Sequence, residues 1–469
     1  MRCFGPQAYD LKEHTKSLDM KEVYDVIIIG GGPTGSTLAT FLSRAGHRVL
    51  VLEKEKFPRE HIGESMLPFC YDIFEELGVL DGMKANFTRK PGVTFANIDG
   101  SRSSHWCFSR VINGPQSLSF HARRSEFDEL LLNNSRKAGA EVREEMQVTK
   151  VELGQPGDNA MVYVQSRQGE ALTFEGRFLL DASGQDCFMP RMLRNQKPFS
   201  RLNIRLALSS HWKNARLDET LSNGNIRIVH IGGEKLGWIW MIPLKDDRLS
   251  VGLALNMNYA QEQRKILSKE HGAREWQQAL YLQELNTSPL VMSILGEAEM
   301  YWDVVSNGDY SYYAEQKYGH NFAIVGDSAA FLDPIFSSGI YLGMVAAKMV
   351  AEGVDKILRG NDYSAVEKAY ADMDGGYKVI EELICTFYEP NSIALSDLQD
   401  NGNFSYDKFE SAYSILHLLL AGDFFKEPER YLRAINTLRS QEMIDKYKSL
   451  TGHLDAKMEQ KVCLMPEMQ

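Results

Sequence analysis

The sequence predicts an α/β fold because three kinds of segment follow one another along its 469 residues. An apolar, β-branched run at residues 24–29 precedes a glycine-rich turn and a helical pattern, which is typical of a buried parallel sheet. Short alternating runs between residues 201 and 256 predict a mixed or antiparallel sheet. Beyond Tyr363 the pattern is helical. We therefore expect a parallel-sheet unit, a second sheet and a helical C-terminal region.

The start of the chain has the pattern of a Rossmann-like βαβ unit. A strand at Tyr24–Ile29 leads into Gly30-x-Gly32-x-x-Gly35, a helix and a second strand that ends at Glu53. The glycines let backbone N–H groups approach a pyrophosphate at the N-terminus of the helix. Glu53 lies 23 positions after Gly30, close to the spacing of an acid that binds ribose hydroxyls. The motif predicts a dinucleotide cofactor, and a glycine turn without a ligand is its alternative.

The rest of the chain is predicted to alternate between these parts. Residues 1–22 form a polar leader, and residues 23–200 form the nucleotide-binding domain with an excursion into the second sheet near 88–122. Residues 201–305 supply the second sheet and one helix over 259–284, and residues 306–358 return to the first domain. Residues 359–469 form the helical region. Further expectations are single strands at 105–111 and 142–153 and a long helix at 339–358.

Composition excludes several classes of partner. The chain has 52 Lys and Arg against 63 Asp and Glu, a net charge of −11, so a nucleic-acid partner is not expected. No run approaches the roughly 20 apolar residues of a membrane helix. The first 20 residues are polar and unlike a signal peptide. A soluble, cytoplasmic protein that binds no membrane is therefore expected.

The cysteine and histidine patterns predict neither disulfides nor a metal. Six cysteines are scattered without C-x-x-C spacing, which favours free thiols in a reducing cytosol. The histidines form no H-x-x-x-H or His/Cys ligand group, so we expect no metal site. The six cysteines are Cys3, Cys70, Cys107, Cys187, Cys385 and Cys463.

A second motif, Trp238-Ile239-Trp240-Met241-Ile242-Pro243, narrows the function. Alone, two tryptophans at i and i+2 indicate one strand face, usually packed in a core. Together with the glycine fingerprint, the motif resembles the flavin-dependent halogenases of the p-hydroxybenzoate hydroxylase-like FAD-dependent monooxygenase superfamily. The resemblance implies FAD as cofactor and a passage between flavin and substrate. Its lining residues would be Trp238, Trp240, Ile242, Pro243 and Phe336.

The resemblance covers roughly residues 24–355 and assigns further cofactor contacts. Residues 181–184 and Gly326-Asp327 resemble the second and third flavin-binding segments, and Arg124 stands in an R-x-x-F-D element. Asp327 would bind ribityl hydroxyls, and a helix N-cap is its alternative or additional role. Residues 57–65 resemble a strap over the flavin, with a plain surface turn as the alternative. The cofactor residues so implied are Gly30, Gly32, Pro33, Thr34, Gly35, Glu53, Lys54, Glu64, Ser65, Arg124, Asp181, Gly184, Gly326, Asp327, Pro334 and Gly339.

The same resemblance places the reaction. Ser338 and Gly339, at the start of a predicted helix, would offer backbone amides to chloride or bromide, while simple capping by Ser337 or Ser338 explains the serines equally well. Reduced FAD, as a C4a-hydroperoxide, would oxidise halide to hypohalous acid, which reaches Lys90. The Lys90 ammonium would polarise that oxidant, or its amine would form a haloamine. The alternative is an ordinary solvated lysine.

One departure from the family bears on the substrate. Halogenases of free tryptophan carry an acid where this chain has Phe336, so a phenol or pyrrole that needs no positioned base is favoured. Whether that aromatic small molecule is free or tethered to a carrier protein is left open. Because the sequence shows no second nucleotide fingerprint, reduced FAD is expected from a separate NAD(P)H-dependent flavin reductase. The alternatives are an aromatic hydroxylase, a reductase of the geranylgeranyl type and a non-catalytic flavin sensor.

Overall fold

The computed structural model describes residues 23–202, 204–308, 311–389, 392, 394–398, 407–445 and 463, and the side chains of its last-but-one helix from residue 414 onward. The predicted polar leader at residues 1–22 lies outside these ranges. Nowhere in the described part of the chain does a helix combine the length and apolar character that a membrane span requires.

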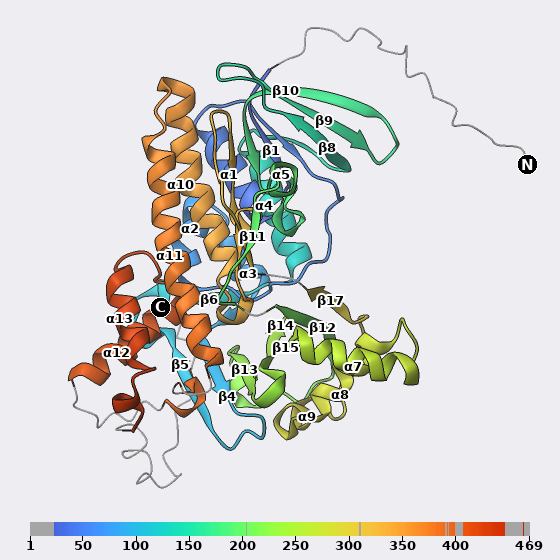
Figure 1. Ribbon diagram of the computed structural model, residues 1–469, viewed down its shortest axis with the longest axis vertical. Coiled ribbons are helices and arrows are strands. Elements are labelled where there is room, and N and C mark those ends of the chain that lie inside the picture. Colours follow the sequence, from blue (N-terminus) through green and yellow to red (C-terminus); the bar gives the residue numbers. More distant parts are fainter. Residues whose placement is uncertain are drawn as a thin grey trace, which may run out of the picture.

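A seven-stranded sheet carries the glycine fingerprint (Figure 1). Its centre is parallel, because β1 runs alongside both β2 and β10, and β10 also runs parallel to β19. Most buried side chains of the centre are apolar, as expected for strands covered on both faces. The strands are β1 (Tyr24–Ile29), β2 (Val49–Leu52), β7 (Glu141–Arg143), β8 (Met146–Glu152), β9 (Ala160–Ser166), β10 (Ala171–Asp181) and β19 (Phe322–Ile324).

The expectation of a single strand over 142–153 is wrong. The chain turns at Glu145, whose φ is 60°, so that β7 pairs with β2 and β8 pairs with β9. The two strands lie at opposite ends of the sheet order. Helices pack against this sheet and against one another, with α1 contacting both α4 and α10. They are α1 (Pro33–Arg44), α2 (Tyr71–Leu77), α3 (Leu80–Asn86), α4 (Arg124–Lys137), α10 (Gly339–Gly360) and α11 (Ser364–Tyr388), of which α10 confirms the predicted long helix.

A second, eight-stranded sheet lies beside the first unit, and α7, α8 and α9 lie together over one side of it (Figure 1). Period-two alternation divides its side chains. Ile239 and Met241 pack beneath the helices, whereas Trp238 and Trp240 belong to the core shared with the first unit. The sheet comprises β4 (Gly92–Ala96), β5 (Ser103–Cys107), β12 (Arg205–Lys213), β13 (Ile226–Ile231), β14 (Gly237–Leu244), β15 (Arg248–Asn256), β16 (Glu299–Met300) and β17 (Val305–Gly308).

Two further expectations in this region are wrong. The helix over 259–284 is two helices, α7 (Met257–Glu270) and α8 (Trp276–Asn286), because Gly272 has a φ of 101° and breaks the pattern. The strand over 105–111 ends at Cys107, and a 3₁₀ turn, η2 (Phe108–Arg110), follows it. In both places the apolar pattern of the sequence continues past the residue at which the helix or the strand ends.

The remaining elements connect the two sheets and form the C-terminal helices. A two-stranded ribbon joins β3 to β6 and leads from the first unit into the second sheet. α12 and α13 follow α11 and lie on the same side of the molecule as α11, which contacts α13 (Figure 1). The elements are β3 (Thr88–Lys90), β6 (Ser119–His121), α5 (Phe188–Leu193), β11 (Gln196–Pro198), α6 (Glu219–Ser222), α9 (Pro289–Leu295), β18 (Tyr312–Ala314), β20 (Ala330–Phe331), α12 (Asp407–Ala421) and α13 (Pro428–Thr437).

Candidate active site

A cavity of about 730 Å³ opens at the carboxyl ends of β1 and β2, beside the N-terminus of α1. This is the edge of a parallel sheet where nucleotides bind. The structure brings ten of the predicted cofactor residues to its wall, although they come from six separate stretches of sequence. They are Gly30, Gly32, Pro33, Thr34, Glu53, Lys54, Arg124, Gly184, Asp327 and Gly339.

The glycine turn leaves room for a phosphate. Gly30 has a φ of 97°, and a Cβ atom on Gly35 would lie 1.9 Å from the Gly30 carbonyl oxygen, so both positions require glycine. Gly32 caps α1 without any side-chain hydrogen bond, which leaves N–H groups of the first turn for a ligand. Glu53 accepts a 2.7 Å hydrogen bond from the Gly31 amide and faces the same cavity. These features fit the pyrophosphate and ribose of FAD.

Three predicted cofactor residues support the cavity without lining it. Gly35 belongs to the turn described above. A Cβ on Gly326 would lie 2.5 Å from the Thr34 hydroxyl, so this glycine lets two loops meet. Asp181 is fully buried and accepts hydrogen bonds from the Ser183 amide, the Met189 amide and the Ser328 hydroxyl. Its carboxylate therefore holds the loop around Gly184 in place.

A second cavity, of about 140 Å³, adjoins the first. The two share residues including Arg124, Asp327 and Gly339. The rest of the wall of this flavin-side cavity comes from the strap, from the second sheet and from residues 331–340, which meet here. Predicted residues on this wall are Glu64, Ser65, Trp238, Trp240, Ile242 and Pro334.

The two tryptophans form a rigid part of this wall. Their ring centres are 5.2 Å apart, and both side chains are at least 95% buried. Pro243, one residue beyond Ile242, alternates to the opposite face of β14. Phe336 is buried with its ring centre 6.1 Å from that of Phe387, outside the flavin-side cavity wall. The passage residues expected from the sequence are thus only partly brought together.

Charged groups gather where the two cavities meet. Arg124 holds Asp128 with contacts of 2.7 and 2.9 Å and donates to the Ile62 carbonyl of the strap. Burial raises the pKa of Asp327 to about 6, and Arg124 opposes that rise. Asp327 lies inside the 3₁₀ turn η6 (Gly326–Ser328), so its expected role as a helix N-cap is wrong. Its carboxyl is left to face the cavities.

The N-terminus of α10 also points toward this junction. Ser338 is the residue before the helix, yet no side-chain hydrogen bond caps it, and Ser337 has a φ of 55°. Capping by either serine side chain, the alternative considered from the sequence, is therefore wrong. Gly339 lines both cavities, and Ser338 is buried beside it. The first-turn amides of α10 carry partial positive charge toward a halide or a reduced flavin.

Lys90 ends β3 and is completely buried, so the alternative of a solvated lysine is wrong. Its Nζ donates a 2.8 Å hydrogen bond to the Met66 carbonyl oxygen and lies 5.5 Å from the centre of the Phe108 ring. Burial lowers the pKa of this amine to about 7, against a weaker, raising influence of Cys70. The lysine is therefore a partly neutral amine at physiological pH. Among the described residues that line the two cavities, Lys90 is absent.

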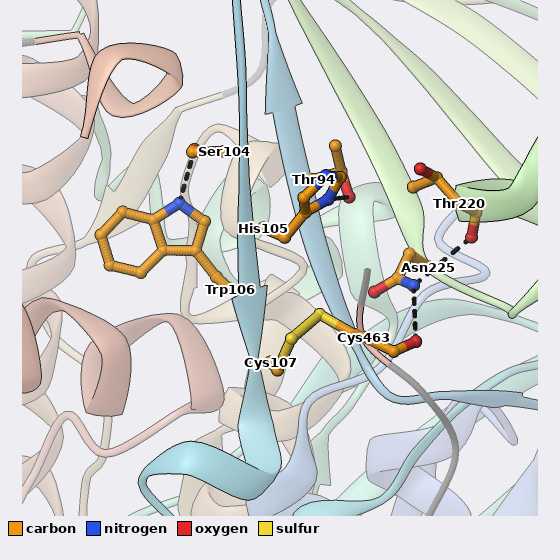
Figure 2. Close-up of a disulfide and its surroundings, with 8 residues drawn as sticks. All are labelled: Thr94, Ser104, His105, Trp106, Cys107, Thr220, Asn225 and Cys463. Carbon is orange, nitrogen blue, oxygen red and sulfur yellow. Dashed lines mark hydrogen bonds between the residues drawn. A yellow bond between two sulfur atoms is a disulfide. The ribbon is translucent and has the colours of Figure 1, made fainter. Parts of the chain in front are cut away.

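The expectation that all cysteines are free thiols is wrong. Cys107, at the end of β5, forms a disulfide with Cys463, 356 positions later (Figure 2). Asn225 donates to the Cys463 carbonyl and holds Cys463 beside β13 (Figure 2). Cys107 directly precedes Phe108, whose ring contacts the Lys90 amine, so the disulfide lies one residue away from a contact of Lys90. Cys70, Cys187 and Cys385 are free, and Cys3 lies outside the described residues.

Sequence patterns missed two groups that the fold brings to the site. Arg59 lines the first cavity and forms a 3.1 Å ion pair with Asp128. Arg59 lies in residues 57–65, the segment that resembles a strap over the flavin, so the sequence could have predicted this contact. Residues 147–150 of β8 also line that cavity, although their alternating pattern indicates only a strand. Met66 and Phe108, the contacts of Lys90, have no signature in the sequence.

Comparison with known proteins agrees with this geometry. Residues 23–373 match the family model described as an FAD binding domain, so the fold and site define an FAD-binding protein. A tryptophan 2-halogenase of Chondromyces crocatus is 35% identical over 372 residues, 78% of this chain and 68% of that protein. A pyrrole-2-carbonyl-[peptidyl-carrier protein] chlorinase of Pseudomonas fluorescens is 29% identical, over 80% and 86% of the two chains. The chain belongs to the flavin-dependent halogenases.

Solved structures extend the likeness to the whole fold. The myxobacterial chondrochloren halogenase CndH is 29% identical, with a TM-score of 0.68 over 92% of this chain and 96% of that one. The flavin-dependent brominase Bmp2 is 25% identical, with a TM-score of 0.72 over 92% and 100%. The protein is therefore a flavin-dependent halogenase with FAD as cofactor.

Proposed function

We propose that this enzyme uses reduced FAD, oxygen and chloride or bromide to halogenate a phenol or a pyrrole, with Lys90 transferring the halogen. The observation that carries the proposal is the position of that lysine. Its amine is buried and bonded to Met66, the residue that follows Ser65 of the flavin-side cavity wall. The amine therefore lies one residue behind that wall and would be separated by it from a flavin bound in the cavity.

The first cavity would hold the cofactor. Amides of the first turn of α1 would bind the pyrophosphate, and Glu53 would bind ribose hydroxyls. Asp327 and Arg124 would contact the ribityl and phosphate region, because both line this cavity. When bound in its reduced form, FAD supplies the activation of oxygen that converts halide to hypohalous acid. The amide of Gly339 would hold the halide at the N-terminus of α10.

The rigid wall of Trp238 and Trp240 would keep substrate away from the flavin and keep the oxidant inside the protein. Lys90 then acts as a nucleophile through its neutral form. The amine attacks hypohalous acid, forming an N–halogen bond and releasing water. The aromatic carbon next takes the halogen from nitrogen, and the ring proton leaves, so the amine is regenerated. A pKa near 7 makes the neutral amine available.

Phe336 supports the choice of substrate. A buried phenylalanine at this position accepts no proton, so the aromatic ring must be activated by its own hydroxyl or ring nitrogen. Phenols and pyrroles meet this condition. One relative is named as a chlorinase of a carrier-bound pyrrole, which supports this class, whereas another is named as a tryptophan 2-halogenase. Reduced FAD would come from a separate NAD(P)H-dependent flavin reductase, and NADH consumption by the purified chain alone would contradict that part.

The test combines the protein with FAD, a flavin reductase, and panels of phenols and pyrroles, free and carrier-bound, under each halide in turn. We expect product masses that carry the isotope pattern of the added halogen. A gain of one oxygen without halogen would instead indicate an aromatic hydroxylase. FAD binding with no turnover of any substrate would indicate a flavin sensor.

A further inference from the structure

Three titratable side chains that the proposed mechanism does not use run from the surface to the flavin-side cavity. Glu64 lines that cavity and is 2% exposed, His211 of β12 is 3% exposed, and Tyr301 is 39% exposed. His211 Nε2 lies 2.9 Å from Glu64 Oε1, and His211 Nδ1 lies 3.3 Å from the Tyr301 hydroxyl. The three groups form one continuous path from solvent to the cavity.

The fold holds this path in place. The Tyr301 amide donates to the His211 carbonyl, and the Ser210 hydroxyl donates to the Trp302 carbonyl at 2.6 Å. The Trp302 ring centre lies 4.5 Å from that of the imidazole. His211 Nε2 lies at ion-pair distance from Glu64 Oε1 but off the line of a hydrogen bond, so proton transfer between them requires the carboxyl to rotate.

Packing alone does not account for such a pair. Removing a carboxylate and an imidazole from water costs free energy, and apolar residues of similar volume often stabilise a protein as well or better. A buried pair that reaches a reaction cavity therefore points to a role in the reaction. The halogenation chemistry has a matching need for a proton.

Formation of the oxidant consumes one proton in each turnover. Reduced flavin (FADH2), oxygen, halide and a proton give FAD, hypohalous acid and water, so charge, atoms and electrons balance. Two electrons come from the flavin and two from the halide, and oxygen accepts all four. The strap residues Glu64 and Ser65 stand in the cavity wall, so the Glu64 carboxyl faces the space in which this proton would be consumed.

We propose that Tyr301, His211 and Glu64 relay this proton from solvent to the flavin-side cavity, a role that rests on the proposed function. The Tyr301 O–H bond breaks as its proton passes to His211 Nδ1, and water restores the hydroxyl. The proton on Nε2 then passes to Glu64, whose O–H bond delivers it into the cavity. The ring returns to its starting tautomer before the next turnover.

Nearby cations suit the outer end of the relay. Lys213 Nζ lies 4.7 Å and the Arg248 guanidinium carbon 5.8 Å from the centre of the Tyr301 ring. Burial raises the pKa of Tyr301, and the positive charges of Arg248 and Arg123 oppose that rise. The relay thus has a donor exposed to water, a buried carrier and an acceptor at the reaction cavity.

A first test needs no cofactor. Ring ¹⁵N resonances of histidine would be recorded on the flavin-free protein, with the His211 signals identified by their loss in His211→Gln. We expect Tyr301→Phe to shift the Nδ1 resonance and Glu64→Gln to shift the Nε2 resonance. His47→Gln, which breaks an imidazole–carboxylate pair with Asp355 away from the cavity, should leave both unchanged. His211 signals that ignore both variants would overturn the relay.

A second test measures hypohalous acid, trapped by a 1,3-diketone, with supplied reduced FAD. We expect about a tenfold lower rate in His211→Gln and in Glu64→Gln, with FAD affinity retained in His211→Gln. Glu64→Asp keeps a proton-carrying group and should be faster than Glu64→Gln, whereas a purely structural role predicts the reverse because Gln keeps the shape. Equal rates in wild type and His211→Gln would overturn the relay. No trapped oxidant from the wild type would instead overturn the proposed function, and the resonance test would still decide the relay contacts.

Discussion

The amine of Lys90 donates its hydrogen bond to the carbonyl oxygen of Met66, at 2.8 Å, with no exposure of the lysine to solvent. Met66 directly follows Ser65, which faces the flavin-side cavity. The backbone from Ser65 to Met66 and one hydrogen bond therefore link the wall of the flavin-side cavity to Lys90, the residue proposed to carry the halogen. This relationship makes the properties of Lys90 measurable in several independent ways.

Burial of Lys90 should cost stability in a pH-dependent way. The pKa is about 7 in the fold against the 10.5 of an ordinary lysine, so the unfolded chain binds more protons between these pH values. Wild-type stability from this group therefore rises with pH across that window. Lys90→Met should be more stable than wild type at pH 7, by roughly 2 kcal/mol after the lost hydrogen bond to Met66 is included.

Urea unfolding at pH 7 and at pH 9.5 checks this expectation, with the gap between the variant and wild type shrinking at the higher pH. Lys368→Met serves as the control because Lys368 is exposed and pairs only with Asp372. A gap of the same size at both pH values would mean that Lys90 titrates normally in the fold.

The form of the lysine that reacts should appear in the pH profile. If the neutral amine takes the halogen, product formed per hypobromous acid should rise with pH through about 7, with bromide used because hypochlorous acid itself ionises near neutral pH. Nearby Cys70 stays a thiol because burial raises its pKa to about 12, and burial keeps His121 neutral by lowering its pKa. Simultaneous trapping of the oxidant and of product gives the ratio. A fall above pH 7 would instead assign the ammonium as a hydrogen-bond donor.

The Cys107–Cys463 disulfide should stabilise the enzyme by tying Cys463 to the second sheet. Replacement of both cysteines by serine should lower the free energy of unfolding by about 2–4 kcal/mol. Cys385→Ser is the matched control, because Cys385 is a half-buried free thiol. Chemical denaturation of the three proteins gives the comparison. An unchanged stability of the double variant would show that the disulfide does not form or has no effect on folding.

The glycine turn should not tolerate a methyl group at Gly35. The added Cβ would meet the Gly30 carbonyl at 1.9 Å, so Gly35→Ala should remove FAD binding, as followed by flavin fluorescence. Gly360→Ala, where no atom lies within 4 Å of the added Cβ, should bind FAD like wild type. Normal FAD affinity in Gly35→Ala would contradict the assignment of this turn.

Local sequence patterns correctly predicted the elements that are formed by residues close together in the sequence. The strand and turn around Gly30 and the helix at Gly339 are short-range features, so their positions followed from the sequence. The contacts of Lys90 come from Met66 and Phe108, which reach it only through tertiary folding. The partner of Cys107 is 356 residues away, and no spacing rule spans that distance. The helix break at Gly272 was missed because the apolar pattern continues on both sides.

The most direct test of the central claim is Lys90→Ala, assayed with reduced FAD, halide and a phenol or pyrrole that the wild type accepts. The account predicts flavin oxidation and trapped hypohalous acid at wild-type levels, with halogenated product reduced about a hundredfold or more. Lys90→Arg should fail in the same way, because a guanidinium has no accessible neutral amine. Halogenated product at wild-type rates from either variant would contradict the account.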